Sequence, residues 1–424
     1  MFNDYSQLLI DVQKKSNIAI SSVRDLKFLK EVIESNTAQK IGFNTLRRLF
    51  GFLEAKKPNI NTLNTLAIYL GFRSFSNYKN SQLNYDEWYF QQNLQRLLYL
   101  KDLNKEELHL INTGLSNHHN LIYLAYFLTY YIEKNKIKLL KSVFNTIDFN
   151  NFSGTDLHKF SMIISSSLNR LSEKKSFTIY ENLIDIAAFR NAIPLLYIDY
   201  NNLNSRYYKI LGFIEKLAAN SSDLFFVSLM KYYKNFYTEN HTSYIEIRKP
   251  KDFEDFYIVL QGRYYGVCIL KDELNDELKI EIIEKCKQSN VSNFAIEIIP
   301  ALIIKEEYDF LEELLSLFYE ELLENYVWSS TTNNSIYLIA LANVNFKNNK
   351  TKIAKSNLEI IELEKVELSY ESYVKLFYSL TKLKLSFKEN DKLENKRTYK
   401  LIKELVKKYD YIKFSTEAKK YYIR

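Results

Sequence analysis

The side chains that most often perform catalysis or bind metal ions are scarce in this chain, and their spacing suits neither task. On a helix, the adjacent residues His118 and His119 would point about 100° apart and would be poorly placed to share a metal ion. None of the histidines forms the HExxH pattern of zinc proteases; the others are His109, His158 and His241. No nucleophile stands in a recognisable arrangement with a base. We therefore expect no enzyme activity, no metal ion and no cofactor.

The cysteines and glycines point away from two further kinds of site. Cys268 and Cys286 are too few for a disulfide framework and are not spaced as paired zinc ligands, so we expect buried thiols in a reducing compartment. Gly262 and Gly266 flank Arg263 but form neither a P-loop nor a dinucleotide fingerprint. The sequence therefore predicts no phosphate-cradling loop.

The chemistry that remains is electrostatic, and it is concentrated near the N-terminus. The whole chain has a formal net charge of +7. Residues 1–80 hold twelve Lys or Arg and six Asp or Glu, a net charge of +6, whereas the other 344 residues are nearly balanced at +1. This asymmetry is typical of a nucleic-acid-binding module joined to a neutral body.

The composition predicts that helices position these charges. The 424 residues include only 8 Gly and 4 Pro, too few for the turns of a β-sheet protein of this size. Helices joined by short Asn, Asp, Ser or Lys turns need few of either. We expect an all-α, cytoplasmic chain without a signal peptide or a membrane span, because no basic leader precedes an apolar run and no apolar stretch approaches ~18 residues.

Hydrophobic periodicity predicts four short helices and a last turn within residues 1–80. Their expected ranges are 5–14, a second beginning after residue 22, 44–50 and 62–70. Ser22 is a natural N-cap for the second helix, and Asn44 can cap the third. Gly51 and Gly71 are expected to stop the third and fourth helices.

The segment from residue 44 to residue 71 carries a recognisable pattern. It consists of Asn44-Thr45-Leu46-Arg47-Arg48-Leu49-Phe50-Gly51, then Pro58, then Thr62-Leu63, Leu66-Ala67 and Leu70-Gly71. This pattern resembles the second half of a lambda-repressor-like helix-turn-helix domain, in which a recognition helix ends at a glycine and a "TL..LA..LG" helix closes the core. The chain departs from that family in its longer spacer from Gly51 to Pro58 and in residues 35–41, which replace a small-residue turn.

The resemblance implies that the helix 44–50 enters the major groove of duplex DNA, with its buried face at Leu46 and its polar residues projecting outward. The residues implied to bind DNA are Asn44, Thr45, Arg47, Arg48, Lys56, Lys57 and Arg73. The four on the helix would contact base edges or phosphates, since Arg can pair bidentately with guanine, and the last three would hold the backbone. The alternative is a small helical domain that docks protein, with solvated arginines.

Residues 85–424 follow a boundary near residues 80–84 and are expected to form a helical-repeat body. Helical patterns of roughly 12–18 residues alternate with polar breaks, which predicts helix pairs of roughly 35–40 residues. The residues that resemble the packing positions of a tetratricopeptide (TPR) repeat are Leu338, Leu341, Ala342, Ala354 and Leu358. Ser335 and Ser369, which open successive units, are 34 residues apart, the period of that repeat. We expect a TPR-like α-solenoid; the alternative is a non-repeating α-helical bundle.

The overall layout is similar to that of peptide-sensing helix-turn-helix regulators with TPR-like bodies. Most of the 34 Tyr and 28 Phe are expected in the core, and some Tyr could line a concave peptide-binding surface. The leading hypothesis is a DNA-binding transcriptional regulator whose body senses a peptide or protein, or forms a homodimer. The competing hypothesis is a non-catalytic interaction scaffold, for example a component of a defence or secretion assembly.

Overall fold

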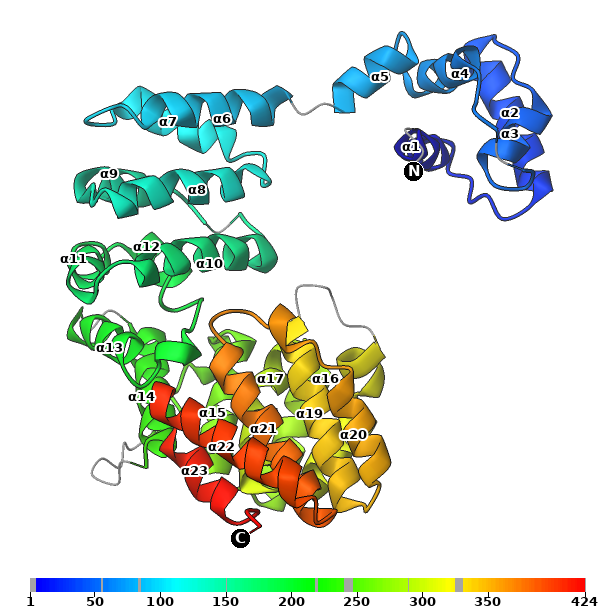
Figure 1. Ribbon diagram of the computed structural model, residues 1–424. Helices are drawn as coiled ribbons and strands as arrows, with labels where there is room; N and C mark the ends of the chain where they lie inside the picture. Colours follow the sequence, from blue (N-terminus) through cyan, green and yellow to red (C-terminus); the bar gives the residue numbers. More distant parts are fainter. Residues whose placement is uncertain are drawn as a thin grey trace. The chain divides into compact units, whose positions relative to one another are not determined.

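The computed structural model is all-α, as the composition predicts: the residues it describes form helices and turns and no β-strand. These residues are 5–54, 56–82, 85–149, 151–217, 220–239, 247–288, 290–324 and 331–423. The chain divides into an N-terminal unit, Met1–Gln92, and a C-terminal unit, Asn93–Arg424 (Figure 1). The division falls inside α6 (Tyr85–Leu97), beyond the boundary expected at 80–84, of which residues 83–84 lie outside the described residues.

Helices α1 to α5 form the N-terminal unit around one hydrophobic core. Their bounds are Ser6–Ser16 (α1), Val23–Thr37 (α2), Phe43–Leu49 (α3), Ile60–Leu70 (α4) and Phe75–Gln82 (α5). The core combines Leu8 of α1, Leu29 of α2 and Leu66 of α4 with Leu46, the buried residue of α3. α4 packs against α1, α2 and α5, and the short helix α3 packs on α2. The three longest helices of the unit, α1, α2 and α4, therefore support α3.

Three of the expected helix ends are confirmed. The Ser22 side chain accepts the Asp25 N–H while Asp25 accepts the Ser22 N–H, a capping box that starts α2. Gly51 and Gly71 adopt φ of 79° and 103°, left-handed values that suit glycine because it has no Cβ. They follow α3 and α4, as predicted.

The prediction that Asn44 caps α3 is wrong. The carbonyl of Gly42 accepts the Thr45 N–H at 3.0 Å and the Leu46 N–H at 3.1 Å, so the helix already begins at Phe43. The Asn44 Oδ1 atom instead accepts a hydrogen bond from Arg47. The start of α4 also differs, since Asn59 caps it through the Asn61 N–H and the helix begins at Ile60 rather than residue 62.

The C-terminal unit contains the rest of α6 and the helices that follow it. Their bounds are Lys105–Gly114 (α7), Asn120–Glu133 (α8), Ile137–Phe144 (α9), Gly154–Arg170 (α10), Glu173–Leu183 (α11), Ala187–Ala192 (α12), Arg206–Leu217 (α13), Ser221–Tyr237 (α14), Ile258–Leu270 (α15), Asp276–Gln288 (α16), Val291–Lys305 (α17), Tyr308–Leu317 (α18), Thr331–Lys347 (α19), Thr351–Glu359 (α20), Glu371–Lys388 (α21), Lys392–Tyr409 (α22) and Ile412–Lys419 (α23). Short helical turns lie at Tyr200–Asn202 (η1), Phe253–Asp255 (η2), Glu320–Glu324 (η3) and Leu363–Lys365 (η5). Among the described residues, no helix is both long and apolar enough to cross a membrane.

Left-handed residues at chain turns explain how so few glycines suffice. The described non-glycine residues at positive φ are Asn17, Ala38, Asn135, Glu239, Asp272, Glu306, Asn349, Asn390 and Asp410. Six of these nine are Asn or Asp, whose short polar side chains tolerate this conformation better than other side chains do. Asn and Asp therefore occupy most of the described left-handed positions, which glycine occupies in many other proteins.

Helices of the C-terminal unit pack on the next helix but one. α8 packs on α10, α15 on α17, α17 on α19 and α19 on α21, while α20 packs beside α19 and α21. In the pair α19–α20, which the sequence likens to a TPR, Ala342 and Ala354 are fully buried. The all-α prediction is thus confirmed, and the TPR-like repeat stays a prediction.

The contact between α15 and α17 is unusually close because α15 carries two glycines one turn apart. A Cβ atom on Gly266 would lie 2.6 Å from the backbone oxygen of Glu297, and one on Gly262 would lie 2.7 Å from that of Phe294. The backbone of α17 thus occupies space that any other side chain would need. The two glycines that form no phosphate loop serve helix packing.

Arg263 and Glu297 form a buried ion pair across the same contact. The Arg263 Nε atom donates to Glu297 Oε2 at 3.0 Å and its second nitrogen donates to Oε1 at 2.6 Å. The side chains are 4% and 5% exposed. Burial by itself lowers the pKa of Arg263, but the charge and hydrogen bonds of Glu297 together with the neighbouring Tyr200 and Tyr370 raise it by more, so the pKa is raised. Such bidentate pairs are strong, and losing one partner leaves a buried charge uncompensated.

The last helices of the C-terminal unit return to its middle segment at η1. The Tyr411 hydroxyl donates to the Tyr200 carbonyl at 2.6 Å, and the Ser372 N–H donates to Asn201 Oδ1 at 2.8 Å. α23 packs beside α14, so segments about two hundred residues apart in sequence are neighbours (Figure 1). The rings of Tyr200 and Tyr373 stack at 4.7 Å, which confirms for this cluster that tyrosines serve core packing.

Replacing Gly266 by Ala should destabilise the C-terminal unit, because the added methyl would meet the α17 backbone. We expect a loss of about 1–3 kcal/mol, the range for adding a carbon to a packed core, seen as a lower Tm in calorimetry of the full chain. Gly212→Ala in α13 is the matched control, because nothing lies within 4 Å of its Cβ position. That variant should gain up to about 1 kcal/mol from helix propensity. Equal stability of the two variants would contradict the close approach.

Replacing Glu297 by Ala should cost about 3–5 kcal/mol, because it leaves the Arg263 guanidinium buried without its carboxylate. The double variant Arg263→Met with Glu297→Met should recover most of that loss, since apolar side chains of similar volume need no partner. Denaturant unfolding of Arg263→Met, of Glu297→Met and of the double variant checks this. Losses that simply add in the double variant would show that the two side chains do not stabilise each other.

Candidate nucleic-acid interface

Helix α3 presents three of the sequence-predicted residues on one face. At 100° per residue, Asn44 and Arg48 lie about 160° from Leu46, which is fully buried, and Arg47 lies about 100° from it, so the three share one sector of about 100°. Asn44 is exposed, and Arg47 and Arg48 are half-buried. Thr45 lies a quarter-turn to the side and is also half-buried, so it projects less than the sequence predicts.

Arg47 lies along the helix rather than extending freely from it. One of its terminal nitrogens donates to Asn44 Oδ1 at 3.4 Å. Its Nε atom is buried and has no hydrogen-bond partner within the described residues. Its carbonyl accepts the Phe52 N–H at 2.8 Å and the Leu53 N–H at 3.1 Å, so the chain folds back over the end of α3. Of the two arginines, Arg48 is therefore the better placed to reach a ligand.

Polar contacts on both sides fix the turn between α2 and α3. Glu34 Oε1 accepts the Ile41 N–H at 2.9 Å, and Glu34 Oε2 accepts a hydrogen bond from Lys30 at 3.2 Å. The Thr65 hydroxyl of α4 donates to Gln39 Oε1 at 2.8 Å. The Ile41 N–H, followed by Lys30, lowers the pKa of Glu34 and so favours its charged form. These contacts hold α3 in one orientation on α2 and α4.

Sequence reasoning missed Glu34 and Gln39 as positioning residues. Glu34 stands seven residues before the amide that it accepts, and Thr65 stands 26 residues after Gln39. Neither spacing belongs to a local motif such as a capping box. Only the packing of α2 against α4 brings these groups together.

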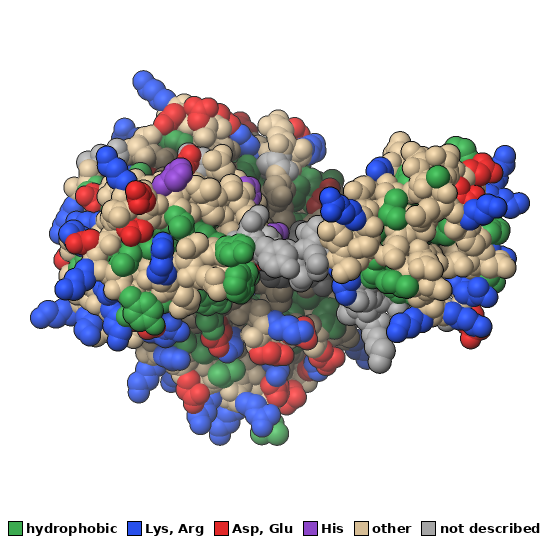
Figure 2. Space-filling view, turned by 90° about the horizontal axis from the view of Figure 1, so that it is seen from above, with side chains coloured by type: hydrophobic (Ala, Val, Ile, Leu, Met, Phe, Trp, Pro, Cys, Tyr) green, Lys and Arg blue, Asp and Glu red, His purple; other side chains and the backbone are tan. Residues whose placement is uncertain are grey.

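The remaining predicted residues lie in the segments that follow α3 and α4. Lys56, Lys57 and Arg73 are exposed. Among the described residues, neither these three nor Arg48 forms an ion pair. Lys and Arg side chains reach the surface of the N-terminal unit at several places (Figure 2). Since nearby acids do not neutralise them, these side chains create a positive potential that attracts anions.

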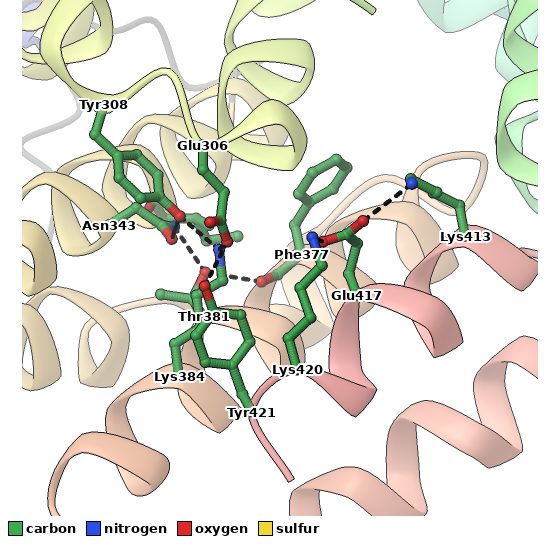
Figure 3. A network of polar contacts seen from close by, with 11 residues as sticks. Glu306, Tyr308, Asn343, Phe377, Thr381, Lys384, Lys413, Glu417, Lys420 and Tyr421 are labelled. Carbon is green, nitrogen blue, oxygen red and sulfur yellow. Dashed lines mark hydrogen bonds and ion pairs between the residues drawn. The ribbon is translucent and has the colours of Figure 1, made fainter.

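A second cluster of ionisable groups is buried in the C-terminal unit (Figure 3). Lys384 of α21 is 1% exposed and lies 2.7 Å from Glu306 Oε1, and its amine donates to the Tyr308 hydroxyl at 2.5 Å. The Tyr421 hydroxyl donates to the same Glu306 oxygen at 2.7 Å. Burial lowers the pKa of Lys384. Burial by itself raises the pKa of Glu306, but the charge of Lys384, the hydrogen bonds from Lys384 and Tyr421 and the charge of Lys420 together lower it by more, so the pKa is lowered. Through Glu306, this network connects the C-terminal residue Tyr421 to the segment between α17 and α18.

The candidate catalytic and metal-binding residue types are dispersed in the described part of the chain. No three His, Cys, Asp or Glu side chains there come together as a metal site. Both cysteines are free and buried, and burial raises the pKa of each thiol to about 12. His158 Nε2 lies 2.7 Å from Glu367 Oε1, a contact that joins α10 to the segment before α21. His241 lies outside the described residues.

Comparisons of the chain with protein-family models, with curated proteins and with solved structures find no match. A function must therefore be inferred from the charges and geometry of this chain.

Replacing Glu34 by Gln should remove a pH-dependent restraint on the α2–α3 turn. The folded-state pKa of Glu34 is lowered from 4.5, so its stabilising contribution is complete above that pH and is lost as pH falls through the folded pKa. The hydrogen-exchange protection of the Ile41 amide should therefore drop on acidification in the natural protein. In Glu34→Gln it should be nearly independent of pH and weaker than in the natural protein at neutral pH, because the amide oxygen still accepts the Ile41 N–H but carries no charge. The control is Glu31→Gln, on the exposed side of α2. If Glu34→Gln left the protection of the Ile41 amide unchanged, Glu34 would not restrain the α2–α3 turn.

Proposed function

We propose that the chain is a DNA-binding transcriptional regulator. Its N-terminal unit contacts duplex DNA, and its C-terminal unit senses a peptide or protein partner or mediates homodimerisation. The observation that carries the proposal is the polar, basic face of α3 opposite buried Leu46, in a segment of net charge +6. We place the regulator in the cytoplasm, in keeping with its free, buried thiols.

The chemistry of this face suits a DNA groove. Arg48 can pair bidentately with a guanine edge and exposed Asn44 with an adenine edge. Lys56, Lys57 and Arg73 supply exposed positive charges for the phosphates. The contacts of Glu34 and Gln39 support the proposal further, because a fixed α3 binds without first having to be ordered.

The C-terminal unit supplies the sensing part of the proposal. Serial packing of α15, α17, α19 and α21 is typical of solenoids, which bind peptides and proteins on extended surfaces. In a homodimer, a partner bound to this unit would alter the spacing of two N-terminal units. Binding of the partner would thereby change the affinity for paired half-sites on DNA.

The second candidate is a non-catalytic interaction scaffold, for example in a defence or secretion assembly, whose N-terminal unit docks protein. Two exposed apolar residues favour it: Phe28 is 59% exposed and Ile60 is 56% exposed. Large apolar side chains left at a surface often mark protein contacts where they cluster. The partly buried Arg47 also fits a protein-docking surface.

The salt dependence of DNA binding separates the two functions. Arg47→Ala combined with Arg48→Ala in the full chain should weaken binding to a fluorescent duplex and reduce the slope of log K against log salt by about 2. The matched control is Lys174→Ala with Lys175→Ala, an adjacent exposed basic pair on α11. The control should leave the slope unchanged. A slope that the α3 variant does not alter, or no measurable duplex binding, would support the scaffold instead.

A further inference from the structure

The near-neutral charge of residues 81–424 conceals two parts of opposite sign. Residues 392–424 carry eleven Lys or Arg and four Asp or Glu, a net charge of +7. Residues 81–391 therefore carry a net charge of −6. A second basic segment, as strongly charged as residues 1–80 and less than half as long, lies at the far end of the sequence.

Five of these eleven basic side chains lie on one face of α22. At 100° per residue, five lysines fall within a sector of about 80°; this lysine stripe consists of Lys392, Lys396, Lys400, Lys403 and Lys407. All five are exposed. The buried residues of the helix, Asn395, Thr398 and Ile402, lie on the opposite side. With a rise of about 1.5 Å per residue, the stripe is about 22 Å long.

The lysine stripe is not balanced by acids. Within the described residues, Lys392, Lys396, Lys403 and Lys407 form no ion pair, and Lys400 lies 3.8 Å from Glu404 with both side chains largely exposed. Like charges at a spacing of three or four residues destabilise a helix by about 0.2–0.5 kcal/mol a pair. Positive and negative side chains usually alternate on the exposed face of a solvated helix, whereas the stripe places five positive side chains in a row, where they repel one another.

Hydrogen bonds of Asn395 hold α22 on the protein with the lysine stripe exposed. The Asn395 amide donates to Ser386 Oγ at 3.1 Å and to the Tyr421 carbonyl at 2.9 Å, and its Oδ1 accepts the Ile423 N–H at 2.9 Å. α22 packs against both α21 and α23. A helix that binds a lipid surface inserts its apolar face, and on α22 the apolar side chain of Ile402 is buried in the protein. Leu393 and Leu401 are 81% and 45% exposed, but they lie outside the sector of the lysine stripe. The stripe itself therefore offers a ligand only a row of charges.

We propose that the lysine stripe of α22 is a second nucleic-acid contact, which binds the phosphate backbone of duplex DNA without reading its sequence. A duplex carries one phosphate for about every 1.7 Å of its axis, counting both strands, so its backbone presents negative charge along the whole length of a stripe about 22 Å long. Lysine suits this task because it contacts phosphate as a point charge on a flexible stem. The inference does not depend on α3, since the two surfaces belong to different units of the chain.

The test uses the full chain carrying Arg47→Ala and Arg48→Ala, so that binding by α3 does not obscure the result. The stripe variant changes the five lysines of the stripe to Gln. The matched control changes five other exposed lysines to Gln: Lys101, Lys134, Lys174, Lys175 and Lys352. Each protein is titrated against two duplexes of unrelated sequence, vesicles of phosphatidylcholine with phosphatidylserine, and polyglutamate. Calorimetry checks that the variants keep the Tm of the parent.

We expect both duplexes to bind the parent and the control equally, with a steep salt dependence. The stripe variant should lose about 4 to 5 units of the slope of log K against log salt, and its affinity should fall at least tenfold. Equal duplex binding by the stripe variant and the control would overturn the proposal. Stripe-dependent binding that is tighter to vesicles or to polyglutamate would also overturn it, in favour of a membrane or an acidic protein. Failure of the α3 experiment would leave this result intact, because α3 is inactivated in every protein compared.

Discussion

Two glycines one turn apart on α15 let its backbone reach that of α17, and Arg263 and Glu297 pair across the same contact. Much of the C-terminal unit is built outward from this place. α17 carries α19, α19 carries α21, and α21 carries α22 with its basic face. The return of the chain to η1 then joins α21 and α23 to the middle segment. Because no side chain fits where Gly262 and Gly266 meet the backbone of α17, the register of these two helices tolerates little variation.

Buried charged side chains and surface charged side chains differ in whether they form ion pairs. Buried charges are paired: Arg263 with Glu297, Arg190 with Asp223 at 2.8 Å, and Lys384 with Glu306. Water no longer solvates such groups, so an unpaired one would cost several kcal/mol, on the order of its desolvation. At the surface pairing is optional. The unpaired basic groups on α3 and α22 therefore cost little in folding and are available for the polyanion binding proposed above.

The two surfaces would contribute differently to a complex with DNA. The α3 face combines Asn44 with arginines, side chains whose planar groups can distinguish bases. The α22 face consists of lysines, which neutralise phosphates without distinguishing sequences. A chain with both would gain affinity from one and discrimination from the other. Residues 81–391 carry a net charge of −6, which does not favour binding of a polyanion there.

By itself the sequence determined the helical class, because 8 Gly in 424 residues leave few other ways to turn the chain, and Asn or Asp supply most of the left-handed turns. Local signals also located the N-cap at Ser22 and the stops at Gly51 and Gly71, since those involve neighbouring residues. Only the tertiary structure decided that Glu34 and Gln39 hold the α2–α3 turn, and that Gly262 and Gly266 serve packing rather than phosphate binding. It also turned lysines spaced along residues 392–407 into one exposed stripe, because burial of the opposite face of α22 is a property of its neighbours. The charge was present in the sequence, but which face carries it depends on packing.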